Sequence, residues 1–104
     1  MTTTALMICV AGLLNLPAPD YTPMVIEVKT AQLQELCPSD KHWLRFGCYH
    51  PTTQSIFIDG ARVLKDETIS HELAHHIVIQ AGQHYNVPHS EVRWAADRAE
   101  VRCR

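Results

Sequence analysis

The pentapeptide HELAH at positions 71–75 constrains this chain more than any other stretch. It follows the pattern H-E-x-x-H inside a run, 66–80, that we predict to be one helix. Residues four apart on a helix lie above one another on the same face, so His71 and His75 can offer two imidazole nitrogens to one metal ion. Glu72 lies about 100° further round the axis, and its carboxylate would stand beside the metal, where it can accept a proton from water.

The alternative interpretation is a buried helix without a metal. Apolar Ile69, Leu73, Ile77 and Val78 lie along the same run, and the two histidines could be core residues with hydrogen-bond partners of their own. Two core histidines flanking a glutamate would need unusual polar partners, so we prefer the metal site. His76 points about 100° away from the second histidine, and we expect it to be partly exposed and not a ligand.

In these positions the chain resembles the zincin metallopeptidases. His71, Glu72 and His75 match the family motif residue for residue, and a looser likeness in architecture extends from Met24 to Cys103. The resemblance implies a Zn²⁺ cofactor and hydrolysis of peptide bonds in a protein or peptide substrate. It also implies a small α+β, zincin-like domain, in which a short antiparallel or mixed sheet packs against the active-site helix and a C-terminal helix follows.

A catalytic zinc ion usually has three protein ligands and one open position. The metzincin pattern H-E-x-x-H-x-x-G-x-x-H is not satisfied, because Val78 and Ala81 occupy the positions of its glycine and last histidine. A gluzincin-like arrangement takes a glutamate from the following helix, which we expect over 91–102 with Ser90 as its N-cap. By this analogy we predict Glu91 as the third ligand.

Four other residues compete for the third position: His84, His89, Asp97 and Glu100. The two histidines lie in the expected loop and could reach the metal if the loop folds back, whereas the two acids would require a closer approach of the second helix. Glu91 could also be only a favourable charge in the first turn of a helix. Gluzincins often carry an aspartate four residues after the ligand, but Ala95 stands there, which leaves the partner that orients a histidine ligand unassigned.

The implied mechanism uses zinc to lower the pKa of water and to polarise the scissile carbonyl. Glu72 would take the proton and pass it to the leaving amine. A donor to the oxyanion would help, and Tyr85, His84 and His89 are candidates by position. Two other classes stay open: a zinc-binding, zincin-fold regulatory or interaction module with little hydrolysis, and a structural domain without metal.

The length and net charge of the chain limit the number of domains and disfavour a nucleic-acid-binding protein. The chain has 104 residues, 46% of them hydrophobic, which indicates one folded domain, and its formal net charge is −2. The carboxyl-terminal arginines alternate with acids, so there is no basic stripe of the kind that binds nucleic acid. The sequence does not determine the oligomeric state.

The amino-terminal run 5–16 is apolar but too short to span a bilayer as a helix. It has the length of a signal-peptide core, although no basic residue precedes Lys29. We therefore expect 1–18 to be a signal peptide or an apolar segment and 19–104 to be the metallopeptidase domain, in the periplasm or secreted. The alternatives are a buried strand or helix of the domain and a cytoplasmic protein.

The four cysteines bear on the same question. Cys37 and Cys48 flank a short segment and could close a disulfide loop, which suits an oxidising compartment. Cys103 would then be left over if Cys9 is removed with the signal. The alternative is a set of reduced thiols in a cytosolic protein. A zinc site made by cysteines is disfavoured, because no C-x-x-C pair occurs.

The remaining elements are a strand over 23–29, a short helix over 31–36 capped by Thr30, and a hairpin over 43–58. Leu33 and Leu36 should face the sheet. The resemblance implies that strand 55–58, or its neighbour in the hairpin, binds an extended substrate as an added strand. The alternative is that the hairpin only covers the core.

Overall fold

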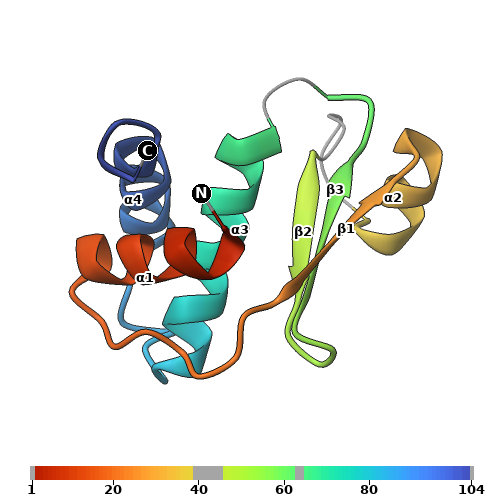
Figure 1. The fold of residues 1–104 in the computed structure, drawn as a ribbon. Helices are drawn as coiled ribbons and strands as arrows, with labels where there is room; N and C mark the ends of the chain where they lie inside the picture. Colours follow the sequence, from red (N-terminus) through yellow and green to blue (C-terminus); the bar gives the residue numbers. More distant parts are fainter. Residues whose placement is uncertain (1, 39–45, 63–64, 104) are drawn as a thin grey trace.

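The chain is an α+β domain in the computed structural model, which describes residues 2–38, 46–62 and 65–103 (Figure 1). Four helices and a three-stranded mixed sheet make up this part of the chain, which confirms the α+β class, whereas the zincin-like architecture stays a prediction. In chain order the elements are α1 (Thr3–Leu14), β1 (Met24–Val28), α2 (Thr30–Leu36), β2 (Gly47–His50), β3 (Ser55–Asp59), α3 (Lys65–Gln80) and α4 (His89–Arg102).

The sheet has the strand order β1-β3-β2. β1 pairs in parallel with β3, and β2 pairs antiparallel with β3 across the turn at 51–54. The predicted hairpin is therefore present, although its first residues, 43–45, lie outside the described part of the chain. β3 has a partner strand on both sides, so the backbone of 55–58 cannot accept an added strand. Of the two hairpin strands that the sequence analysis proposed as binding strands for substrate, only β2 lies at an edge of the described sheet.

Side chains along β3 alternate between the two faces of the sheet, and each face packs against a different layer of helices. Ile56 and Ile58 are buried on the face that packs against α3, together with Leu73 and Ile77. The opposite face packs against α2 through Leu33, as the sequence indicated. In Figure 1, α3 stands between the sheet and the pair α1 and α4, whereas α2 covers the other face of the sheet. The helix that carries the motif is thus central to the larger core.

Helix α1 is part of that larger core. Met7, Val10 and Ala11 are buried among the side chains of α3 and α4, and Cys9 forms a disulfide with Cys103. The expectation that Cys103 has no partner is therefore wrong. No helix in the described ranges combines the length and the apolar character that a bilayer crossing requires. That 1–18 is a signal peptide stays a prediction.

The second disulfide, Cys37–Cys48, is the predicted one, and it joins the end of α2 to β2. No cysteine among the described residues is a free thiol. Two disulfides in one small domain are compatible with an oxidising compartment.

Helices α3 and α4 form the frame of the candidate site. α3 ends where expected: Gly82 has φ 69°, and its amide donates to Ile79. α4 begins at His89, two residues earlier than the sequence suggested, because Pro88 with φ −69° is its N-cap and Ser90 lies inside the first turn. The two helices run antiparallel beside each other (Figure 1). The first turn of α4 therefore returns to the face of α3 that carries the motif.

Candidate metal centre

Three histidine side chains meet between α3 and α4, and we call them the three-histidine cluster: His71, His75 and His89. The Nε2 atom of His71 lies 3.1 Å from Nε2 of His75 and 3.2 Å from Nε2 of His89. One ligand atom from each residue lies within 4.8 Å of the other two. His71 and His75 come from successive turns of α3, as the motif spacing predicted, and His89 is the first residue of α4.

The spacing of these nitrogen atoms fits a tetrahedral metal ion. Zinc binds imidazole nitrogen at about 2.0–2.1 Å, so two nitrogens of one tetrahedron lie about 3.3 Å apart. The separations of 3.1 and 3.2 Å are close to that edge. Three imidazoles on one side of an ion leave a fourth position for water or substrate. The three histidines could therefore hold a metal ion through three imidazole nitrogens.

Glu91, the predicted third ligand, is not part of this cluster. Residues two apart on a helix point about 200° from each other, so α4 cannot direct both His89 and Glu91 at α3. Both residues are exposed, but the structure directs the ring of His89 towards His71, and Glu91 is not in the group. The other competitors also lie outside the group that the described residues form: His84, Asp97 and Glu100.

The environment of His71 keeps its imidazole neutral. Its pKa is lowered from the usual 6.5 to about 4, chiefly by burial and also by the neighbouring charges of His89 and Arg93. Asp97 acts in the opposite direction. A neutral imidazole has a free lone pair, which is the form that binds a metal. The influence of Arg93 and Asp97 on His71 was missed from the sequence, where α4 was interpreted only as a solvated face.

Glu72 is buried, with 6% of its surface exposed. It follows His71 directly, so helix geometry directs its side chain about 100° round the axis from that of His71. The role of Glu72 as a general base beside a metal stays a prediction.

The expectation that His76 is partly exposed is wrong. The residue is fully buried, and its Nε2–H donates to the backbone carbonyl of Tyr21 at 2.9 Å. Its Nδ1 atom therefore accepts a hydrogen bond from the Tyr49 hydroxyl at 2.6 Å. Burial lowers the pKa of His76, which agrees with a neutral ring that bonds at both nitrogens. His76 thus ties α3 to β2 and to the segment before β1, one residue after the second motif histidine.

A second group of metal-ligating residue types lies on β2 and the end of α2: Cys37, Cys48 and His50. The two sulfur atoms are joined in a disulfide, so they offer no thiolate to a metal. His50 is held by a hydrogen bond from Nε2 to the carbonyl of Leu36 at 2.9 Å. This group is structural in the oxidised protein.

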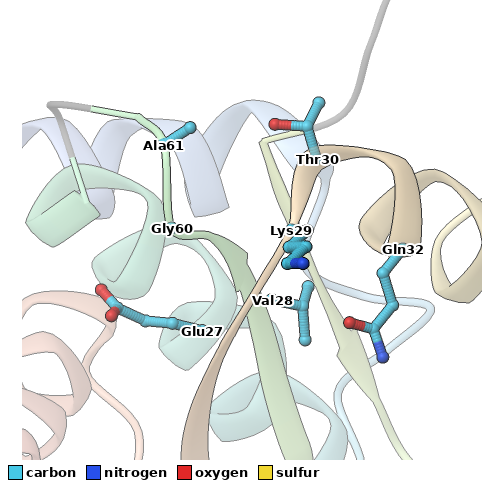
Figure 2. Close-up of a pocket in the computed structure, with 7 residues that line it drawn as sticks. All are labelled: Glu27, Val28, Lys29, Thr30, Gln32, Gly60 and Ala61. Carbon is cyan, nitrogen blue, oxygen red and sulfur yellow. The ribbon is translucent and has the colours of Figure 1, made fainter.

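A shallow pocket lies at the other end of the sheet, where β1 ends and α2 begins (Figure 2). Its wall includes Glu27, Thr30 and Gly60, and it contains no residue of the three-histidine cluster. Next to Gly60 in the chain, the buried carboxylate of Asp59 accepts from the Thr30 hydroxyl and the Ala61 amide, both at 2.9 Å. Those bonds explain Asp59 as the residue that fixes the turn after β3.

Comparison with protein-family models, with curated proteins and with solved structures finds no match for this chain. The chemistry of this chain is therefore inferred from its own residues and their geometry. The resemblance to zincins remains a resemblance over five positions.

Proposed function

We propose that this protein is a zinc-dependent metallopeptidase, with zinc held by His71, His75 and His89 and with Glu72 as the general base. The observation that carries the proposal is that Nε2 of His71 lies at the spacing of a zinc tetrahedron from Nε2 of both His75 and His89, on a helix that also carries the buried Glu72. A structural zinc site has four protein ligands, whereas three ligands leave a position for chemistry. This arrangement favours an enzyme over a site that only stabilises the fold.

When bound there, zinc supplies Lewis acidity, which makes water more acidic and a carbonyl more electrophilic. The chain supplies the proton transfer. The Glu72 carboxylate takes a proton from the attacking water and gives it to the departing amine, so the glutamate ends the cycle as it began. His76 holds α3 against β2 through Tyr49, and this connection fixes the helix turn from which Glu72 and His75 project.

The described sheet has two edges, β1 and β2, and the substrate backbone fits β2 better because β2 is the edge strand packed against α3. β2 packs against α3 and forms one edge of the described sheet. A peptide added to this edge would run beside the helix that carries Glu72, with main-chain hydrogen bonds that tolerate many sequences. We further propose that the protein acts in an exported, oxidising compartment, a proposal supported by its two disulfides.

The test is cleavage of a mixed peptide library by zinc-loaded wild type and by Glu72→Gln, followed by mass spectrometry. Glutamine keeps the shape of the side chain but cannot accept the proton, so we expect the rate to fall by about 10²–10⁴-fold while zinc stays bound. His84→Gln, on the exposed loop, is the matched control. Full activity in zinc-loaded Glu72→Gln would contradict the assigned role. A zinc-loaded wild type that cleaves nothing would favour a binding module.

A further inference from the structure

The face of α4 that carries His89 continues with a basic residue. Arg93 lies four residues further along the helix, which is about 6 Å along the axis and about 40° round it. Because α3 and α4 run antiparallel (Figure 1), this turn of α4 runs back along α3 from the level of the cluster. Arg93 is exposed, so its side chain can reach a ligand that lies against the cluster from solvent.

The guanidinium of Arg93 is available for a ligand. It forms no ion pair with another residue of the described part of the chain, although Asp97 lies one turn further on α4. The neighbouring Arg98 differs, because its guanidinium lies over the ring of Trp94 at 5.8 Å. Arg93 lies close enough to the cluster for its charge to act on the His71 ring.

The charges at the site favour an anionic partner. Three neutral imidazoles leave both positive charges of a zinc ion uncompensated, and the guanidinium of Arg93 would add a third positive charge. Glu72 and Asp97 are the acids already placed beside the site, so a net positive charge remains. A ligand that brings a carboxylate would reduce that excess, and the planar fork of an arginine binds a carboxylate through two parallel hydrogen bonds.

We propose that Arg93 binds a carboxylate of the peptide substrate and so makes the protein selective for substrates with an anionic group close to the scissile bond. Two sources have this chemistry: the free carboxyl terminus of a short peptide, and the side chain of an aspartate or glutamate. The inference rests on the proposed function, and it makes Arg93 a specificity-determining residue and not a ligand of the metal.

The first test is equilibrium binding to zinc-loaded Glu72→Gln protein, measured by calorimetry or by NMR titration. One probe pair is N-acetyl-trialanine with a free carboxylate and the same peptide as its amide. A second pair is N-acetyl-Ala-Ala-Glu-amide and N-acetyl-Ala-Ala-Gln-amide. We expect the anionic member of at least one pair to bind about 10- to 100-fold more tightly, and the pair that shows the preference identifies the source of the carboxylate.

The same titrations are then made with Arg93→Gln, Arg93→Lys and Arg98→Gln in the Glu72→Gln background. Arg93→Gln should abolish the preference, Arg93→Lys should retain part of it because the charge remains, and Arg98→Gln should keep it all. Zinc content should be the same in every variant. Equal binding of both members of both pairs by the parent, or an unchanged preference in Arg93→Gln, would overturn the proposal.

The second test separates this inference from the proposed function. For the peptide that the wild type cleaves fastest, kcat/KM is measured on the anionic and neutral forms in wild type and Arg93→Gln. If the ratio of kcat/KM for the anionic form to kcat/KM for the neutral form falls about 10-fold or more in Arg93→Gln, the result supports the role of Arg93. An equal loss of kcat/KM on both forms contradicts it. If the zinc-loaded wild type cleaves no peptide, the proposed function fails, and the binding comparison still decides the role of Arg93.

Discussion

At the scale of single residues, the environment of His71 connects the fold to the chemistry. The folded protein holds the pKa of this side chain at about 4, mainly through burial. In the unfolded chain the pKa returns to about 6.5. The unfolded state therefore binds more protons between these two values, and the metal-free fold loses stability as the pH falls from about 6.5 to about 4.

We expect His71→Asn to weaken this pH dependence. Asparagine does not titrate, so the free energy of unfolding of the metal-free variant should decrease less than that of wild type between pH 7 and pH 4.5. Denaturant unfolding with a chelator present measures both, and His84→Asn on the exposed loop serves as control. The same pH dependence in His71→Asn and wild type would contradict a buried, neutral His71.

The sequence indicated two of the three residues of the cluster and kept the third, His89, only as an alternative to Glu91, for a physical reason. Residues four apart on one helix share a face whatever the tertiary structure, so His71 and His75 could be paired from spacing alone. His89 depends on where α4 begins. Serine is a good capping residue, so Ser90 was predicted as the N-cap of this helix, which put Glu91 in its first turn. Because α4 actually starts at His89, after Pro88, the residue of its first turn that is directed at α3 is His89 and not Glu91.

At the scale of elements, the contact between β2 and α3 aligns the edge strand with the motif helix. A Cβ atom on Gly47 would lie 2.6 Å from Cγ2 of Thr68 and 2.9 Å from the carbonyl oxygen of Phe57. The second neighbour is backbone and cannot rotate away. Glycine at this position therefore lets β2 approach both α3 and β3.

Gly47→Ala should lower the free energy of unfolding by about 1–3 kcal/mol, because the strand must move away from its neighbours. Gly12→Ala is the matched control, since nothing lies within 4 Å of the added Cβ and the residue is helical. Alanine in a helix should stabilise by about 0.5–1 kcal/mol. The two changes thus have opposite signs in denaturant unfolding, and a neutral Gly47→Ala would contradict the close approach.

Elements with a strong local pattern were predictable within one or two residues. α3 and β1 follow from periodicity, and the turn at 51–54 follows from its composition. The parallel pairing of β1 with β3 did not follow, because it joins segments that are distant in the chain and the sequence of neither strand records its partner. The burial of His76 was missed for the same reason, since its partners Tyr21 and Tyr49 come from other elements.

At the scale of the whole molecule, the disulfide between Cys9 and Cys103 joins the two ends of the described chain across 94 residues. In the chain-entropy model a loop of this size contributes about 4.7 kcal/mol, against about 3 kcal/mol for the Cys37–Cys48 loop. The long loop also holds α1 against α4, where Val10 is fully buried.

We therefore expect the double variant Cys9→Ser with Cys103→Ser to lose more stability than Cys37→Ser with Cys48→Ser. Denaturant unfolding of both variants against wild type measures the difference, provided that mass spectrometry finds residues 1–18 still attached. A larger loss of stability in Cys37→Ser with Cys48→Ser would contradict the role of α1 as part of the folded core.

The most direct test of the metal centre is the zinc content per chain of wild type, His89→Ala and Glu91→Ala, measured by elemental analysis after identical purification and reloading. Wild type and Glu91→Ala should carry one zinc ion, and His89→Ala should lose it, because the fold turns His89 towards His71 and Glu91 away from it. Zinc retained in His89→Ala and lost in Glu91→Ala would contradict the three-histidine centre. A wild type without zinc would remove the basis of the proposed peptidase.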